Sequence, residues 1–342
     1  MKPISLKQLA QALNLSSATV SRALNDSHEV SAETKGRVLA LARELNYEPH
    51  PFASSLRRQK SKTIGVILPE VANNFFSLAI DGIEEIARLN NYHVLVYLTH
   101  DDHSREVDIV QHLAGGRADG ILLSVASETN QFTHLDLLAE RGIPTVFFDR
   151  VRAGSAAATV TTDDHRGGYK ATQHLLQAGC RHIAYLLVSN NLSIGQKRMQ
   201  GYQHAMQEAG LEYSPHLVVQ GQRDKAENVA LIRQLLEEHP EVDGIFASVE
   251  SLALSAYEAC HEVGRRIPED VKVVGFSNMA AAALLEPGLT TITQPAYEMG
   301  REAAKILFKA ITKNKPVLPA QSLELESELV VRRSTEAARL KP

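Results

Sequence analysis

Apolar positions in the first 48 residues recur at helical spacing in three short segments. Each segment is preceded by a serine that can cap a helix, at Ser5, Ser16 and Ser31. Asn14 lies between the first two segments and supplies a turn. Three short helices with one apolar face each predict a helix-turn-helix domain in 1–48.

From residue 63 onward, short apolar runs alternate with longer segments of helical periodicity. The runs predict strands at 63–68, 93–98, 120–125, 144–149, 182–187, 244–249 and 271–276. The segments between and after them predict helices at 75–90, 104–115, 132–142, 167–179, 197–209, 225–238, 251–264 and 297–312. Continuously apolar strands that alternate with helices are typical of parallel sheets covered on both faces.

The strand–helix order begins again after about residue 160. This repeat predicts two similar lobes of the doubly wound type within one body of about 280 residues. Ligands of such folds bind at the carboxyl ends of the strands, so the cleft between the two lobes is the expected ligand site.

The outer face predicted for the second N-terminal helix is small and polar. It carries Ser17, Ala18, Ser21, Arg22 and Asn25. Small side chains let a helix lie close to a DNA major groove, where hydroxyls reach phosphates or base edges and an arginine binds guanine bidentately. The alternative interpretation is a surface helical hairpin without a ligand.

Charge is distributed unevenly along the chain and favours DNA binding. Residues 1–62 contain ten Lys and Arg against five Asp and Glu, a net charge of +5. The whole chain carries −4, so residues 63–342 carry −9. A basic end is suited to phosphate contacts, and an acidic remainder favours solubility.

Residues 49–62 form a basic linker. Pro49 and Pro51 end the helical domain, and the following FASSLRRQK has room for one or two helical turns. So short a segment is not a stable helix by itself in water. It could fold on DNA with Leu56 wedged into the minor groove, but a flexible basic linker fits the composition equally well.

Three stretches carry a family resemblance. They are TVSRALN at 19–25, HEVSAETKGRVLALARELNYEPH at 28–50, and the basic linker with its leucine. Together they resemble the LacI/GalR family of bacterial transcription regulators, and the similarity continues through most of the body. It implies an all-α helix-turn-helix headpiece, a hinge helix in 49–62, and an α/β two-lobed body like periplasmic binding proteins, with doubly wound parallel sheets in 63–342.

The resemblance also implies a function and partners. The protein would be a sequence-specific DNA-binding transcriptional regulator of the repressor type, whose operator affinity is controlled by a small effector bound between the lobes. It would act as a homodimer on a near-palindromic double-stranded DNA operator. The C-terminal tail has no leucine heptads that would indicate a tetramer.

Headpiece residues receive roles by position in the family motif. The residues that choose the operator match Ser16, Ser17 and Ala18, and Arg22 matches a base-reading position. Leu56 matches the hinge leucine that opens the operator centre. Thr19, Ser21 and Asn25 match positions that contact the DNA backbone or hold the headpiece together, and Ala53 matches a small residue that packs beside the hinge leucine.

The family fold implies three crossings of the chain between the lobes. With crossings near 161, 290–293 and 320–325, the first lobe comprises about 63–161 and 293–322. The second lobe comprises about 162–292 and 323–338. Asp163, close to the first crossing, is a further cleft candidate for which a structural role is favoured over ligand binding.

Residues that follow the predicted strands are the candidates for the effector site. Asn74 and Phe76 follow the first strand, and Phe76 matches the family's effector-facing aromatic better than Phe75, although either ring could pack beneath the helix. Asp149 could accept hydrogen bonds from ligand hydroxyls, while Arg150 beside it could form a structural ion pair with it.

Two arginines complete the effector candidates on the second lobe. Arg198 matches the family's effector-binding arginine, which binds vicinal hydroxyls or carboxylates bidentately. Arg223 falls where many relatives have an aromatic that stacks on the ligand, and it would add a charge and a set of donors there.

Two departures from the family pattern change the expected effector. Relatives commonly read A-N-D where this chain has ASVES, so Val249 and Glu250 replace Asn and Asp. Relatives also carry an Asp after V-G-[YF], where Ser277 and Asn278 stand here. Loss of a carboxylate together with the added Arg223 favours an acidic or phosphorylated effector over a neutral sugar, unless Glu250 restores the charge. Glu250 and Ser277 are therefore candidate effector ligands.

Motifs of other functional classes are absent from the sequence. There is no G-x-G-x-x-G after a strand, no G-x-x-x-x-G-K-[ST] and no G-x-S-x-G, so an enzyme is not expected. The 14 histidines contain no H-E-x-x-H, and Cys180 and Cys260 are isolated, so neither a metal nor another cofactor is expected. The absence of a signal peptide and of membrane-length apolar runs predicts a cytoplasmic protein without a membrane partner. The remaining alternative is a small-molecule binding protein without an operator.

Overall fold

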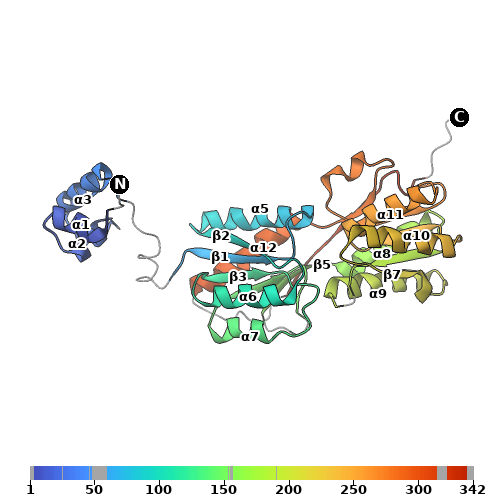
Figure 1. The fold of residues 1–342 in the computed structure, drawn as a ribbon, viewed down its shortest axis with the longest axis horizontal. Coiled ribbons are helices and arrows are strands. Elements are labelled where there is room, and N and C mark those ends of the chain that lie inside the picture. The colour runs from blue at the N-terminus through green and yellow to red at the C-terminus, as the bar shows by residue number, and fades with distance from the viewer. Residues whose placement is uncertain are drawn as a thin grey trace. The chain divides into compact units, whose positions relative to one another are not determined.

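The computed structural model describes residues 4–24, 26–45, 47, 60–152, 154, 157–189, 191–313 and 322–336. It contains two compact units, Met1–Ser61 and Lys62–Pro342. Within the described residues the first unit is all-α and the second, called the body here, is α/β (Figure 1). Asn25 and the two predicted hinge residues, Ala53 and Leu56, lie outside the described residues.

The N-terminal unit is built from α1 (Leu6–Ala12), α2 (Ser17–Leu24) and α3 (Ala32–Glu44). All three predicted serine caps are confirmed, because the hydroxyls of Ser5, Ser16 and Ser31 each accept a hydrogen bond from the backbone N–H three residues on. The apolar faces meet in one small core that contains Leu9, Ala10, Val20, Ala23, Val38 and Ala42. The helical spacing of these positions therefore dictates the packing of the headpiece.

The first lobe of the body has a six-stranded sheet in the order β11-β5-β4-β3-β1-β2. Its strands are β1 (Thr63–Leu68), β2 (His93–Leu98), β3 (Gly120–Leu123), β4 (Thr145–Phe148), β5 (Ala158–Thr162) and β11 (Ser322–Leu325). Its helices are α5 (Asn74–Leu89), α6 (His103–Ala114), α7 (Thr133–Glu140) and α12 (Ala296–Lys313). Helices α5 and α12 cover one face of this sheet, and α6 and α7 cover the other (Figure 1).

The second lobe repeats this arrangement with the order β12-β10-β9-β8-β6-β7. Its strands are β6 (Ile183–Leu187), β7 (Val218–Gln220), β8 (Gly244–Ala247), β9 (Lys272–Phe276), β10 (Thr290–Thr293) and β12 (Glu328–Val330). Its helices are α8 (Asp164–Gln177), α9 (Ser193–Glu208), α10 (Lys225–Glu238) and α11 (Glu250–Glu262), with 3₁₀ turns at Pro215–Leu217 and Ala280–Leu284. Helices α8 and α9 lie together, as do α10 and α11. The pairing in both sheets is parallel, apart from the antiparallel β10 and β12.

The chain passes between the lobes after β5, after β10 and after β11. Strand β11 pairs in parallel with β5, from Ser322 opposite Thr159 to Leu325 opposite Thr162. Residues 323–325 thus belong to the first lobe, and the third crossing follows Leu325. The observed crossing lies at the end of the range 320–325 predicted from the sequence, and β11 extends the first lobe slightly beyond the approximate bound of 322.

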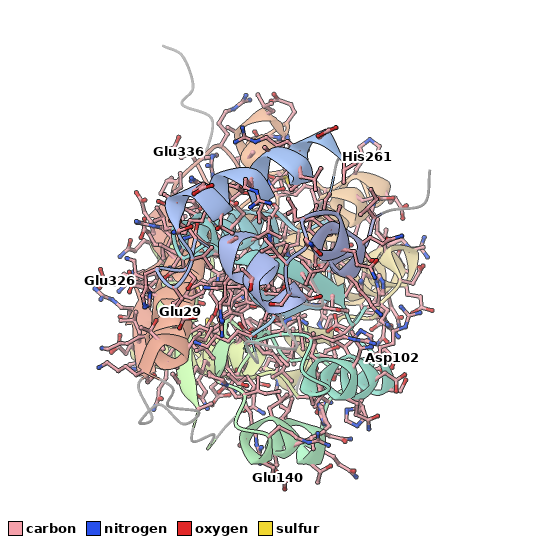
Figure 2. All side chains as sticks on the ribbon, turned by 90° about the vertical axis from the view of Figure 1, so that its left-hand side faces the viewer. Glu29, Asp102, Glu140, His261, Glu326 and Glu336 are labelled. Atoms are coloured by element: carbon pink, nitrogen blue, oxygen red, sulfur yellow. The ribbon has the colours of Figure 1, made fainter. Side chains whose placement is uncertain are left out.

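Part of the acidic surplus of the body lies on its surface, although Glu106, Asp149, Asp163 and Asp164 are buried. Glu140, Glu326 and Glu336 are exposed, and their side chains point away from the body in Figure 2. Exposed carboxylates keep their hydration and repel nucleic acid phosphates. This surface agrees with the division of charge in the sequence.

Helices α5 and α12 pack with their backbones in close contact at two glycines. A Cβ added at Gly300 would lie 2.0 Å from the carbonyl oxygen of Ala79, and one at Gly82 would lie 2.1 Å from that of Tyr297. We expect Gly300→Ala to lower the free energy of unfolding of the body by about 1–3 kcal/mol, because two backbones must separate. Urea denaturation of the full chain measures this change.

Lys309→Ala is the matched control, since Lys309 is an exposed residue of the same helix. A surface substitution of this kind should change the free energy of unfolding by no more than about 0.5 kcal/mol. Equal stabilities of the two variants would show that α5 and α12 do not pack as tightly as described.

Candidate DNA-binding surface and effector pocket

The predicted operator-reading residues lie at the start of α2. Ser16, Ser17 and Ala18 are exposed, while Thr19 and Ser21 are half-buried. The Ser16 hydroxyl caps the helix through the backbone N–H of Thr19. The first turn of α2 therefore presents small polar side chains on a rigid helix.

Arg22 extends from the same helix and lies on the surface. Its Nε is 2.9 Å from a carboxylate oxygen of Glu29, and both side chains are more than half exposed. An ion pair in such an exposed position contributes about 0–1 kcal/mol. Arg22 can therefore exchange Glu29 for another acceptor at little cost.

A pocket of about 30 Å³ lies between the lobes. Its lining residues are Asn73, Phe75, Phe76, Asp149 and Arg150 from the first lobe, Gln294 from the second crossing, and Ile194, Arg198, Val249, Glu250, Phe276, Ser277 and Asn278 from the second lobe. A cavity of this size has room for about one or two water molecules. A larger ligand must move the lobes apart or displace side chains.

Arg198 is the most deeply buried charged residue of this pocket, with 2% of its surface exposed. Its Nε donates to Asp164 at 2.8 Å, and its Nη1 donates to the carbonyl oxygen of Ser248 at 2.6 Å. Its guanidinium carbon lies 3.6 Å from the ring centre of Phe276. An ion pair, a backbone acceptor and an aromatic ring thus fix the arginine in one orientation.

Two buried carboxyl groups lie near Arg198. Burial raises the pKa of Asp164 to about 6, although the charge of Arg198 opposes this shift. Burial also raises the pKa of Asp149, against the charges of Arg150 and Arg198. The ionised form of Asp164 therefore depends on its contact with Arg198.

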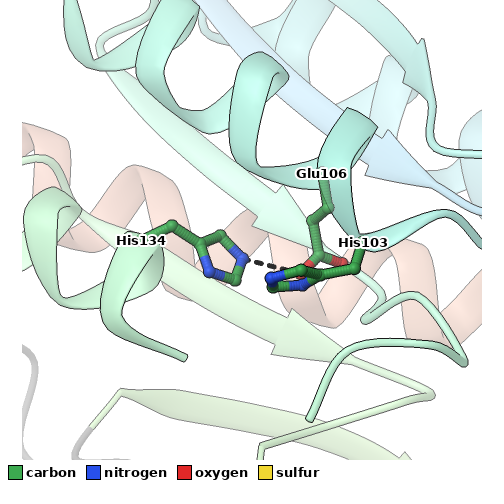
Figure 3. A group of neighbouring side chains, drawn as sticks. All are labelled: His103, Glu106 and His134. Atoms are coloured by element: carbon green, nitrogen blue, oxygen red, sulfur yellow. Dashed lines mark hydrogen bonds and ion pairs between the residues drawn. The ribbon is translucent and has the colours of Figure 1, made fainter. Parts of the chain in front are cut away.

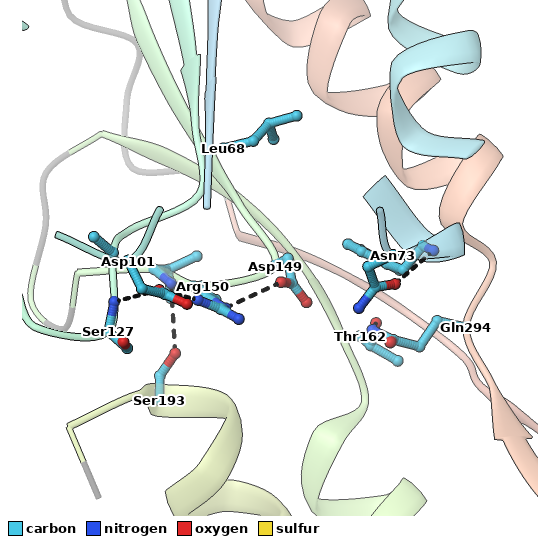
Figure 4. A network of polar contacts seen from close by, with 12 residues as sticks. Leu68, Asn73, Asp101, Ser127, Asp149, Arg150, Thr162, Ser193 and Gln294 are labelled. Atoms are coloured by element: carbon cyan, nitrogen blue, oxygen red, sulfur yellow. Dashed lines mark hydrogen bonds and ion pairs between the residues drawn. The ribbon is translucent and has the colours of Figure 1, made fainter. Parts of the chain in front are cut away.

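Arg150 is held mainly by Asp101. Its Nη1 donates to that carboxylate at 2.6 Å, whereas its Nε is 4.0 Å from Asp149 (Figure 4). Asp101 also accepts a hydrogen bond from the backbone N–H of Ser127 at 2.8 Å. Among the described residues, the buried Nε of Arg150 has no hydrogen-bond acceptor. Arg150 therefore brings an unused donor to the pocket, beside the carboxylate of Asp149.

Both departures from the family pattern lie in the second-lobe wall, where Val249, Glu250, Ser277 and Asn278 line the pocket. Ser277 donates its hydroxyl proton to Glu250 at 2.6 Å. Both line the pocket, so Glu250 supplies a carboxylate where the sequence had suggested that one was lost. Asn74 does not line the pocket, but its side chain donates to the carbonyl oxygen of Asn278 across the lobes at 3.3 Å.

Arg223 lies outside the pocket lining. Its side chain is 64% exposed and pairs with Glu128 of the first lobe at 3.1 Å. It also donates to the carbonyl oxygen of His100. The structure thus places Phe76, Asp149, Arg198, Glu250 and Ser277 together, and it places Arg223 in a contact between the surfaces of the lobes.

Polar residues tie the lobe crossings together. Asp163 accepts hydrogen bonds from the backbone N–H and the hydroxyl of Ser327, at 2.7 and 2.6 Å. Gln294 donates to the hydroxyl of Thr162 at 2.8 Å (Figure 4). The contacts of Asp163 join the first crossing to the third, and the contact of Gln294 joins the second crossing to the first. A structural role for Asp163 agrees with these contacts.

Comparison with known proteins identifies the family. Residues 5–50 match the model for bacterial regulatory proteins of the lacI family, and residues 172–335 match a periplasmic binding protein-like domain. The HTH-type transcriptional regulator RegA of Clostridium saccharobutylicum is 32% identical, over 97% of this chain and 99% of RegA. The chain belongs to the LacI family. It is therefore a DNA-binding transcriptional regulator controlled by a small-molecule effector.

Two further similarities support this assignment to the LacI family. The ribose operon repressor of Halalkalibacterium halodurans is 33% identical, over 97% of each chain. The transcriptional regulator CelR, whose structure was solved in complex with cellobiose, is 30% identical to this chain. The match has a TM-score of 0.74 and covers 97% of this chain and 99% of CelR. These relatives are transcriptional regulators rather than enzymes. No helix in the described part of the chain has the length and apolar character needed to cross a membrane.

Proposed function

We propose that this LacI-family chain is a homodimeric repressor whose operator affinity changes when an effector binds between the lobes. The observation that carries the proposal is a pocket walled by both lobes, with Phe76 and Asp149 on one side and Arg198 and Glu250 on the other. A ligand that touches both walls has different affinities for different lobe arrangements. It therefore shifts the equilibrium between those arrangements.

The proposed effector is a neutral polyhydroxylated molecule of the sugar class. Asp149 and Glu250 balance Arg150 and Arg198 in the lining, and Asp164 adds a further carboxyl behind Arg198. Because the lining has no excess of positively charged side chains, its charge does not favour an acidic or phosphorylated effector. Carboxylates and arginines instead suit hydroxyls, which both donate and accept hydrogen bonds.

Aromatic residues support the same class of effector. Phe76 and Phe276 are both buried, and they line the first-lobe and second-lobe walls respectively. Apolar rings combined with a few polar groups are typical of small-molecule sites. The related CelR was solved with cellobiose, a neutral sugar, which is consistent with this proposal.

The proposed DNA contacts are those of α2. Two subunits would place two copies of Ser16, Ser17, Ala18 and Arg22 on the halves of a near-palindromic operator. The hinge helix, with Leu56 in the minor groove and Ala53 beside it, remains a prediction from the sequence. A leucine wedge requires a flexible step at the operator centre.

Selection of operators from random duplex DNA tests the proposal. It would be carried out alone and with neutral sugars, uronic acids and sugar phosphates. We expect a palindrome with a pyrimidine–purine step at its centre, and at least one neutral sugar that changes its recovery. A response to acidic sugars alone would overturn the effector class but retain the operator. No enriched DNA under any condition would overturn the regulatory role.

A further inference from the structure

Three potential metal ligands converge in the first lobe, outside the effector pocket. His103 and Glu106 lie three residues apart on α6, which places them on one helix face. His134 comes from the first turn of α7, and the three side chains point toward one another (Figure 3). One potential ligand atom from each residue lies within 4.8 Å of the other two.

The carboxylate in this cluster is fully buried. Glu106 has 0% of its surface exposed. One of its oxygens accepts from the backbone N–H of Ala126 at 2.7 Å, and the other accepts from Thr129 at 3.0 Å and His134 at 2.8 Å. A buried carboxylate is satisfied by hydrogen-bond donors, by a paired charge or by a metal ion. The donors present here leave room for a cation, because His134 can turn from a donor into a metal ligand.

The hydrogen bonds of Thr129 indicate which nitrogen of His103 is free to bind a metal. The hydroxyl of Thr129 has one proton, which it donates to Glu106. The Nδ1 of His103, 3.2 Å from the same hydroxyl, must therefore be the donor in that second contact. In the neutral ring Nε2 then carries the lone pair. Metal-binding histidines commonly have this arrangement, with the other nitrogen donating to an outer-shell oxygen.

We propose that His103, Glu106 and His134 bind one divalent transition-metal ion of the zinc class. Two histidines and a glutamate are an established donor set for zinc, and imidazole also suits nickel and copper. The ion would lie between His134 and Glu106 and replace their hydrogen bond, and the neutral ring of His134 would then carry its proton on Nδ1 instead of Nε2. His103 is only half-buried, so it provides a path from solvent.

The site would stabilise a loop that contacts the second lobe. Glu106 holds this loop through Ala126 and Thr129, and Glu128 between them pairs with Arg223. An ion on Glu106 would hold these contacts in place. Metal binding and the contact between the lobes would then be coupled.

Metal titration of the full chain tests the proposal. After removal of metal with a chelator and dialysis, Zn²⁺ binding would be measured by calorimetry. The visible absorption of Co²⁺ would report the ligand geometry. We expect one ion per chain and a tetrahedral Co²⁺ spectrum. His103→Ala should weaken Zn²⁺ binding at least tenfold, because it removes a ligand from the half-buried edge of the site.

Two further variants separate a ligand role from a structural one. His134→Gln retains a donor toward Glu106 but removes the imidazole, so it should also lose the Co²⁺ spectrum. His112→Ala removes an exposed histidine from the same helix and should bind Zn²⁺ like the unmodified chain. Circular dichroism checks that each variant is folded. No stoichiometric Zn²⁺ binding, or equal binding by His103→Ala and His112→Ala, would overturn the site and leave Glu106 and His134 as a buried hydrogen-bonded pair.

Discussion

Arg198→Ala is expected to lower the free energy of unfolding of the body by about 3–5 kcal/mol and to abolish the effector response. The variant leaves Asp164 buried without the guanidinium that its Nε contact now supplies at 2.8 Å. Removal of one partner of a buried ion pair has a cost of this size, because the other charge remains uncompensated. The effector response is lost because Arg198 also lines the pocket.

The destabilisation by Arg198→Ala should depend on pH. The folded-state pKa of Asp164 is already about 6 with the arginine present, and loss of the arginine raises it further. A carboxyl whose pKa is higher in the folded state favours folding at low pH, and this contribution is lost as the pH rises through the folded pKa. Urea denaturation should therefore show a small deficit near pH 5 and the full deficit near pH 8.

A double variant distinguishes the two roles of Arg198. Arg198→Ala combined with Asp164→Asn removes both charges, so it should recover part of the stability but none of the effector response. Arg223→Ala is the matched control, because its ion pair is exposed and contributes no more than about 1 kcal/mol. Equal stabilities of the single and double variants at pH 8 would contradict the buried ion pair. A normal effector response in either variant would contradict the pocket assignment.

Helical periodicity and long apolar runs in the sequence predicted most of the helices and strands of the body. The strand predicted at 63–68 and the helix predicted at 225–238 have the same bounds as β1 and α10. Strands β5, β7, β10, β11 and β12 were missed because ATVTT, VVQ, TTIT, SLEL and ELV contain no long apolar run. Such strands form because they complete a sheet whose other strands are already paired, and a local pattern does not contain that information.

Ligands of this fold bind at the carboxyl ends of the strands, and this rule predicted many but not all of the residues that line the pocket. Asp149 and Ser277 follow β4 and β9 directly, so their positions were predictable. Gln294 follows β10, a strand that the sequence had not predicted. Phe276 ends β9 and reads as another core residue of an apolar strand, and only the contact with Arg198 shows its second role.

Contacts between side chains that lie far apart in the sequence could not be predicted from the sequence. His134 is 28 residues from Glu106, far from any metal-binding spacing that a motif describes. Arg223 was assigned to the effector by its place in the family pattern. Its long side chain instead reaches Glu128, 95 residues away, in the other lobe. Which partner such a side chain finds depends on how the lobes meet, and no local pattern records this.

Arg22→Ala in the headpiece should weaken binding to the selected operator by about 1–3 kcal/mol for each half-site contact. Arg22 lies on the exposed side of α2, and its partner Glu29 is also exposed, so the free headpiece should remain folded. On DNA the guanidinium can leave Glu29 and bind a guanine edge through two hydrogen bonds. Competition between operator and random duplexes at fixed salt measures the change.

Arg43→Ala is the matched control for Arg22→Ala, because Arg43 is an exposed arginine in the last turn of α3. Both variants remove one positive charge, so both should lose a similar small share of salt-dependent nonspecific affinity. Only Arg22→Ala should also relax the base preference at one position of each half-site, since only a base contact carries sequence information. Equal losses on operator and random DNA would make Arg22 a phosphate contact and would leave sequence reading to Ser16, Ser17 and Ala18.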